Sequence, residues 1–172
     1  KGWPLRALRG KVVCDYHGEV VSKQEGERRL ETLTGEPSYL FFFKGKGGKP
    51  LCIDAQNFPC DCHPDQETYG RRMNHSCSKN NVRPQRVSLK FLDGLRECVL
   101  FFALRDIAVS EELLWDYGVR RSSFQGEGWD LSCKNKTKSK SVALHTVSTF
   151  EIKWVIPFQC ISACVLPYFT VK

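Results

Sequence analysis

The chain has 172 residues, of which 41% are hydrophobic and 26% charged, and it carries a formal net charge of +7. This length suits one ordinary domain with its own core. Nine cysteines without an N-terminal signal peptide argue against a secreted disulfide framework, and predict free thiols in a reducing compartment. The positive charge fits a protein that meets nucleic acid or chromatin, or equally a merely soluble surface. Because the sequence starts at Lys1 rather than Met, we expect a piece of a longer product.

The first elements are a strand and a helix. Residues 11–21 are rich in β-branched and aromatic side chains, which predicts a strand interrupted at Gly18. Ser22, followed three residues later by Glu25, forms a capping box that predicts the start of a helix. Gly35 and Pro37 mark the end of this helix, and Gly26 within it is expected to weaken it.

Two pairs of strands follow. Residues 38–43 and 51–54 are short apolar runs joined by a glycine- and lysine-rich hairpin tip. A phosphate-binding loop is disfavoured there, because no glycine-rich pattern leads into a helix. Residues 87–92 and 97–104 flank Asp93-Gly94, a strong hairpin signal. Without alternating βαβ units, the pattern predicts a mainly β fold with short helices and antiparallel pairing.

The C-terminal part differs in character from the rest. Lysines at 134, 136, 138 and 140 form a basic run, and residues 154–171 are uncharged and mostly apolar over about eighteen positions. Pro157 and Pro167 interrupt that stretch and favour an extension over a membrane anchor, although the length could span a bilayer. We therefore divide the chain into 1–133, the candidate catalytic domain, and 134–172, a basic linker with an apolar extension of unknown role.

Two strings about forty residues apart carry the strongest signal. The first is Asn74-His75-Ser76-Cys77, preceded by Gly70-Arg71-Arg72-Met73, and the second runs from Glu111 through Trp115-Asp116-Tyr117-Gly118. In this order, with a hairpin-like stretch between them, they resemble the signature motifs of the SET-domain protein lysine methyltransferases. The strings Tyr16-His17-Gly18, Arg105-Asp106-Ile107 and Glu111-Glu112-Leu113-Leu114 resemble the histone H4 monomethyltransferase branch most closely.

The resemblance implies a SET-domain β-clip fold in which the two strings cross in a knot-like arrangement beside S-adenosylmethionine. Methyl transfer to lysine needs a neutral amine, although the free ammonium has a pKa of about 10.4. An apolar aromatic channel beside a cationic sulfonium lowers that pKa through desolvation and like-charge repulsion. Aromatic residues in or beside the motifs suit this requirement.

The family's site residues can be carried over to matching positions. Tyr117 is the expected catalytic tyrosine, which orients methyl group and amine, and Tyr16 is expected to act with it. Tyr16, Trp115 and Tyr117 are expected to line the substrate channel. The cofactor-binding set is Lys1, Gly2, Trp3, Tyr39, Arg71, Asn74, His75 and Trp129. His17 receives no chemical role, because it equally suits a structural histidine.

Three departures from the family pattern bear on activity. Pro4 occupies the cofactor loop where the family has a glycine, which removes an N–H and fixes φ. The turn from Ala7 to Lys11 is about three residues shorter than the usual connection, which predicts a displaced sheet edge. Trp115 stands where the family usually has Tyr or Phe. We therefore expect a channel that admits one methyl at most, or that is blocked.

Zinc is an alternative use of the cysteines. Cys60, Cys62 and His63 are residue types that bind zinc, but only Cys52 and Cys77 are near enough in sequence to complete a closed site. The family's zinc module after Tyr-Gly is reduced to Cys133. We therefore predict no metal site, while an interaction module that binds zinc and is anchored by its tail remains an alternative.

The sequence thus predicts a nuclear, chromosome-associated protein lysine methyltransferase that uses S-adenosylmethionine, with monomethylation favoured. The expected substrate is a histone tail, alone or in the nucleosome. We also expect non-specific DNA contact through the basic surface, a monomeric state and no membrane attachment. The alternative is a catalytically impaired SET-like domain that acts as a peptide-binding or chromatin interaction module.

Overall fold

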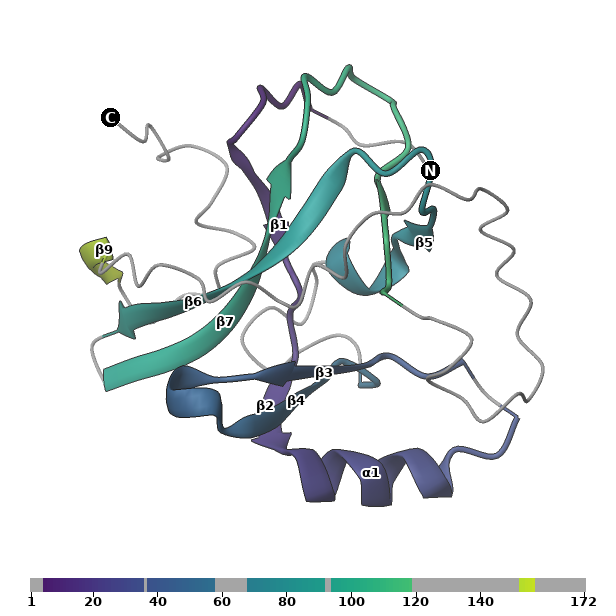
Figure 1. Cartoon of the computed structure of the whole chain (residues 1–172), viewed down its shortest axis with the longest axis vertical. Coiled ribbons are helices and arrows are strands. Elements are labelled where there is room, and N and C mark those ends of the chain that lie inside the picture. The colour runs from purple at the N-terminus through teal and green to yellow at the C-terminus, as the bar shows by residue number, and fades with distance from the viewer. Residues whose placement is uncertain (1–4, 36, 58–67, 92–93, 119–151, 157–172) are drawn as a thin grey trace.

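The computed structural model describes residues 5–35, 37–57, 68–91 and 94–118, together with the backbone of 152–156. Its described strands form one sheet of order β1-β7-β6-β9, a second of order β2-β4-β3, and a third made of β5 and β8 (Figure 1). The strands are β1 (Val12–Asp15), β2 (Glu19–Ser22), β3 (Leu40–Lys44), β4 (Pro50–Asp54), β5 (Asn74–His75), β6 (Val82–Phe91), β7 (Gly94–Ala103), β8 (Leu114–Trp115) and β9 (Ile152–Ile156). The helical segments are α1 (Lys23–Thr32) and the short 3₁₀ turns η1 (Lys46–Gly48) and η2 (Gly70–Arg72).

The predicted mainly β fold with short helices is confirmed. The break at Gly18 separates β1 from β2, and the Ser22 hydroxyl accepts a hydrogen bond from the Glu25 N–H at 3.1 Å, as the capping box predicts. Figure 1 shows α1 lying along the β2-β4-β3 sheet. The close packing of α1 on β4 explains the glycine at position 26, because a Cβ there would lie 2.7 Å from the Cβ of Cys52. The glycine that weakens the isolated helix allows α1 to approach β4 closely.

Both predicted hairpins form. β3 and β4 pair in antiparallel register around η1, where Gly47 and Gly48 adopt positive φ angles of 68° and 79°. β6 and β7 pair antiparallel from Val82 opposite Ala103 to Phe91 opposite Gly94. These strands are longer than their apolar runs, because polar positions and Pro84 continue the ladder where sequence patterns weaken.

The short turn from Ala7 to Lys11 still docks on the sheet. Ala7 and Ile107 exchange backbone hydrogen bonds of 3.1 and 2.8 Å, and the Gly10 N–H donates to the Ala103 carbonyl at 2.8 Å. The short connection is therefore held by backbone hydrogen bonds at both of its ends, while the β1–β7 pair that follows has a register shift between Val12 and Cys14.

The C-terminal region adds one strand that the sequence did not predict. The β9 backbone pairs parallel with β6, with Leu89 opposite Ile152 and Phe91 opposite Ile156. The basic run at 134–140 and residues 157–172 lie outside the described residues. Among the described helices, none combines the length and the apolar character that crossing a bilayer requires.

The main core fills the space between the sheets. Its buried side chains come from most of the strands and include Phe101, Ile53, Val13, Val82 and Ile107, each at most 2% exposed. Tyr16 and Trp115 belong to the same cluster, and Tyr39 and Phe41 pack against it. The aromatic residues of the two motif regions are therefore fixed by the protein core.

Candidate active site

The two signature strings meet in a short parallel strand pair. Asn74 in β5 lies opposite Leu114 in β8, and His75 lies opposite Trp115. The Ser76 N–H extends the pair by donating to the Trp115 carbonyl at 3.0 Å. A parallel pair of neighbouring strands needs a long connection, here through β6, β7 and the loop after them. The crossing expected from the resemblance is therefore present in the backbone.

Asn81 joins the two sides of this crossing. It is 1% exposed, and its amide Nδ2 donates to the Glu112 carbonyl at 2.8 Å and to the Glu111 carboxylate at 3.1 Å. Its Oδ1 accepts from the Leu114 N–H at 2.9 Å, and its own N–H donates to the Leu114 carbonyl at 2.9 Å. A buried amide with these groups satisfied favours one arrangement of the strands over any other.

Tyr117 is anchored at both its backbone and its hydroxyl. Its N–H donates to His75 Nδ1 at 3.1 Å, and its hydroxyl donates to the Met73 carbonyl. Because the hydroxyl donates to that carbonyl, its oxygen lone pairs remain as acceptors. Burial, and then the neighbouring Tyr39, raise the pKa of Tyr117 above its ordinary value. The group is therefore a neutral phenol at physiological pH.

An aromatic cluster connects Tyr16 to Tyr117. The ring of Phe41 lies 5.0 Å from the Tyr16 centroid and 5.5 Å from that of Trp115, which lies 4.4 Å from Tyr117. Burial first, and then Tyr117, raise the pKa of Tyr16, so it also stays protonated. Trp115 is 7% exposed, and its buried Nε1 has no hydrogen-bond partner among the described residues. These rings form an apolar wall with phenol groups at its two ends.

A cavity of about 360 Å³ opens between the two strings. Residues from both strings and from the start of β3 line it: Tyr39, Arg71, Arg72, Met73, Asn74 and Tyr117. The Arg71 guanidinium lies 4.8 Å from the Tyr39 ring centroid and donates to the Ala55 carbonyl at 2.9 Å. The Asn74 amide donates to Glu112 at 2.8 Å. The structure thus brings four of the predicted residues, Tyr39, Arg71, Asn74 and Tyr117, to one cavity.

Other predicted residues fall elsewhere. His75 faces Tyr117, with ring centroids 5.1 Å apart, but it does not line this cavity, and neither do Tyr16 and Trp115. Lys1, Gly2, Trp3 and Trp129 lie outside the described residues, as does Pro4.

Sequence reasoning missed several residues of this region. Phe41 links the rings of Tyr16 and Trp115, and the alternation of β3 could have revealed it, because residues 39, 41 and 43 share one face. Asn81 gave no local signal, and Glu112 belongs to the second string but was given no role. Their roles depend on segments thirty or more residues away in sequence.

The cysteines differ in state. Cys14, Cys52 and Cys98 are free thiols, and burial raises the pKa of Cys52 to about 11. Cys77 is disulfide-bonded, so the expectation that the thiols are free is wrong for it. No cluster of metal-binding side chains occurs within the described segments, and Cys60, Cys62, His63 and Cys133 lie outside them.

Comparison with known proteins identifies the family. A family model of the SET domain matches residues 6–118, so the chain belongs to the SET-domain family. Over 148 residues it is 34% identical to histone-lysine N-methyltransferase EHMT1 of Mus musculus, covering 83% of this chain and 10% of that protein. Over 125 residues it is 34% identical to N-lysine methyltransferase KMT5A of Xenopus tropicalis, covering 70% of this chain and 33% of that protein.

A solved structure agrees with this assignment. The crystal structure of CpSET8 from Cryptosporidium superposes with a TM-score of 0.51 and 27% identity, covering 66% of this chain and 50% of that chain. The chain spans only part of these relatives' lengths. The SET fold and the kinship with lysine methyltransferases are therefore established, and the activity of this chain is addressed below.

Proposed function

We propose that this chain transfers a methyl group from S-adenosylmethionine to the ε-amine of a lysine in a protein, with a histone tail as the substrate. One observation carries the proposal: the parallel pairing of β5 with β8, which brings Asn74 and Tyr117 to one cavity. Kinship with histone-lysine methyltransferases supports the same reaction class.

The residues around the cavity fit the cofactor. A volume of about 360 Å³ lies within the range of ligand pockets, about 300–1,000 Å³. The Asn74 amide and the backbone beside His75 are suited to its polar ends, and the faces of Tyr39 and Tyr117 are suited to a sulfonium cation. Arg71, which is held by its hydrogen bond to the Ala55 carbonyl, packs its guanidinium against the Tyr39 ring and fixes the position of that ring. Lys1, Gly2, Trp3 and Trp129 complete the proposed cofactor-binding set. When bound, S-adenosylmethionine supplies the methyl group.

The chain's own contribution is positioning and desolvation. The rings of Tyr16, Phe41 and Trp115 exclude water, which lowers the pKa of a lysine that enters beside them. The Tyr117 hydroxyl donates a hydrogen bond to the Met73 carbonyl, so its oxygen accepts a hydrogen bond from the incoming amine and orients the amine lone pair. His75 acts through the Tyr117 N–H and is a positioning residue.

Labelled methyl transfer tests the proposal. Purified chain, radiolabelled S-adenosylmethionine and core histones should yield labelled histone, and Tyr117→Phe should reduce the rate by about 10²–10³-fold, as for loss of one oriented polar group. Tyr69→Phe is the matched control, because Tyr69 and Tyr117 are both 40% exposed. Equal rates for wild type and Tyr117→Phe would refute the assigned role of Tyr117.

Monomethylation is the finer part of the proposal. Trp115 is enclosed by Phe41, Phe101 and Tyr117, with ring centroids within 5.5 Å, so its indole cannot turn aside for a bulkier methylated amine. Mass spectrometry of a treated peptide should show one added methyl, and Trp115→Phe should allow more. Abundant trimethyl-lysine from the wild-type chain would contradict this restriction.

The choice of substrate rests on the resemblance to the H4 monomethyltransferase branch. The strings Tyr16-His17-Gly18 and Arg105-Asp106-Ile107 support it. We expect H4 tail peptides to be methylated faster than H3 tail peptides, and nucleosomes to be accepted with non-specific DNA contact through the basic surface. We also propose a nuclear, chromosome-associated location and a monomeric state. A preference for H3 tail peptides would contradict the assignment to the H4 monomethyltransferase branch.

A second candidate is a SET-like domain that binds a peptide without transferring a methyl group. The close packing of Trp115 favours it, because the same indole that limits the channel could fill it. Calorimetry separates the candidates when combined with labelling. Cofactor binding without transfer, together with transfer by Trp115→Phe, would establish the impaired module.

A further inference from the structure

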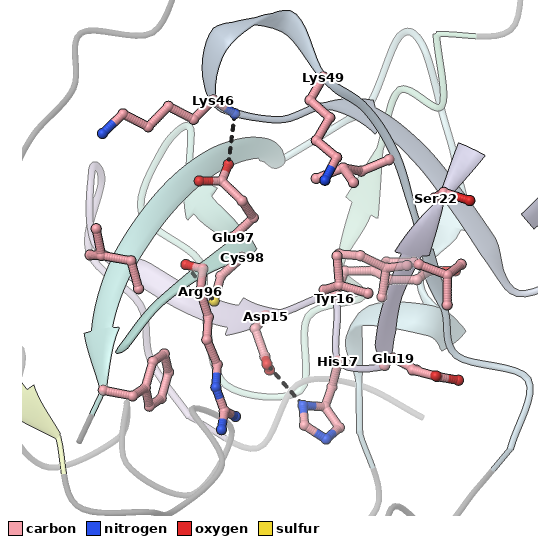
Figure 2. A pocket seen from close by; sticks show the side chains of 17 residues that line it. Asp15, Tyr16, His17, Glu19, Ser22, Lys46, Lys49, Arg96, Glu97 and Cys98 are labelled. Atoms are coloured by element: carbon pink, nitrogen blue, oxygen red, sulfur yellow. Dashed lines mark hydrogen bonds and ion pairs between the residues drawn. The ribbon is translucent and has the colours of Figure 1, made fainter. Parts of the chain in front are cut away.

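A second cavity of about 670 Å³ lies at the other end of the β3–β4 hairpin (Figure 2). It is bounded by the junction of β1 and β2, by the η1 turn, and by the start of β7. None of the residues that line the active-site cavity contributes to it. Tyr16 borders this cavity and also packs against Phe41 of the aromatic cluster. The proposed methyl transfer makes no use of this cavity.

The interior of this second cavity is mainly apolar. Val21, Leu51 and Ile53 come from the β2-β4-β3 sheet, and Leu95 comes from β7. Leu95 is 66% exposed, the most exposed of the large hydrophobic residues in the described part of the chain. An apolar side chain from another molecule that entered beside this leucine would remove apolar area from water on both sides, which favours association.

The carboxylates around the cavity already have partners. Asp15 lies 3.3 Å from His17, and Glu19 lies 2.7 Å from Arg29. Glu97 lies 2.9 Å from Arg86 and accepts a hydrogen bond from the Lys46 N–H at 3.2 Å. Burial alone would raise the pKa of Glu97, but hydrogen bonds from Ser88 and Arg86 outweigh it and keep the carboxylate ionised.

The ammonium groups of Lys46 and Lys49 differ from these carboxylates. Neither forms an ion pair with any described residue, and both side chains are exposed. Figure 2 shows Lys49 directed toward the centre of the ring of lining residues, while Lys46 extends along the rim. Gly47 and Gly48, with positive φ angles, shape the turn that carries both lysines. The opening therefore presents uncompensated positive charge above an apolar interior.

We propose that this cavity is a docking site for an acidic peptide segment of a partner protein, which inserts one apolar side chain beside Leu95 and sets carboxylates against Lys46 and Lys49. Charge complementarity selects this occupant, because the lining carboxylates are already paired and the unpaired charges are cationic. The exposed apolar rim favours a side chain over a small hydrophilic anion.

Fluorescence anisotropy tests this site directly. The probe is the peptide fluorescein-Glu-Asp-Leu-Glu-Glu-amide, labelled at its N-terminal amine, and binding should be detectable below about 1 mM. Removing both ammonium groups with Lys46→Gln and Lys49→Gln should weaken binding about tenfold, because each exposed ion pair contributes only modestly and two are lost. The matched control is Lys79→Gln with Arg83→Gln, which removes the same charge from exposed positions outside the cavity and should change affinity less than about twofold.

The apolar part of the proposal has its own variants. A peptide with serine in place of leucine should bind more weakly to the wild-type chain, and Leu95→Ser should remove most of that difference. No binding by the wild-type chain, equal loss in the two lysine pairs, or indifference to the peptide's leucine would overturn the proposal. Displacement of the probe by a single-stranded oligonucleotide with higher affinity than the peptide would identify the lysines as a nucleic-acid contact and would also overturn it.

Discussion

The β6–β7 hairpin and the β5–β8 crossing represent two ways of pairing strands in one domain. The hairpin pairs ten residues with ten, from Val82–Phe91 to Gly94–Ala103, and its strands are neighbours in sequence. The crossing pairs only two residues with two, from segments forty residues apart. A ten-residue backbone ladder holds the hairpin, and side-chain hydrogen bonds from Arg86 and Ser88 to Glu97 are added to it. The two-residue crossing instead depends on side-chain hydrogen bonds of Asn81, His75 and Tyr117.

This difference shows where the candidate site is vulnerable. Two backbone pairs stabilise the crossing only slightly, whereas closing the long loop between them costs conformational entropy. The crossing therefore depends on individual buried polar groups, and substitutions there should cost more than comparable substitutions in the hairpin. Three predictions test this contrast, from the largest expected effect to the smallest.

Asn81→Ala should have the largest effect. It removes three side-chain hydrogen bonds in a buried site and leaves the Leu114 N–H without its acceptor. We expect a loss of about 3 kcal/mol in the free energy of unfolding, measured by urea denaturation. Asn80→Ala is the matched control, and Gln85→Ala tests the hairpin; both should cost less than about 1 kcal/mol. Similar costs for Asn81 and Gln85 would end the contrast between crossing and hairpin.

Gly70→Ala should have the next largest effect. A Cβ at Gly70 would lie 2.2 Å from the Asp15 carbonyl oxygen, so the backbone of η2 or of β1 would have to move. Such overpacking costs about 1–3 kcal/mol, measured as the shift in the urea midpoint. Because Arg71 follows directly, cofactor affinity measured by calorimetry should fall as well. If this variant were as stable as the wild-type protein, η2 and β1 could move apart to accept the added methyl group without loss of stability.

The smallest effect concerns pH. A hydrogen bond from Arg105, followed by those from the Ala108 N–H and Asn81, lowers the pKa of Glu111 from 4.5 to about 2. The folded-state pKa lies below the unfolded one, so this stabilisation is complete above about pH 4.5 and is lost as the pH falls toward 2. Glu111→Gln should therefore be less stable than wild type at pH 6, with a difference that shrinks in acid.

Thermal unfolding of both proteins across this pH range measures the effect. Glu31→Gln is a suitable control, because Glu31 is an exposed carboxylate of α1 without an ion pair in the described residues. A stability difference between wild type and Glu111→Gln that stays constant from pH 6 to pH 2 would exclude the linkage.

Much of the fold could be predicted because its signals are local. The Ser22–Glu25 cap, the Asp93-Gly94 turn and the glycine-rich tip of the β3–β4 hairpin each depend on residues close together in sequence. The strand extension through Pro84 was missed, because its pairing with Phe101 offsets a poor local propensity. β9 was missed for a similar reason, since its pairing with β6 depends on a distant edge.

The sequence by itself determined the family, the order of the elements and the two strings that define the candidate site, because motif residues and turn signals are read at fixed spacings. Only the tertiary structure decided that Asn81 joins the crossing and that Phe41 links Tyr16 to Trp115. It also decided that, among the described residues, the carboxylates of the second cavity have ion-pair partners while its lysines do not. These properties depend on which distant groups are brought within hydrogen-bonding or van der Waals distance, and that information is absent from any short stretch of sequence.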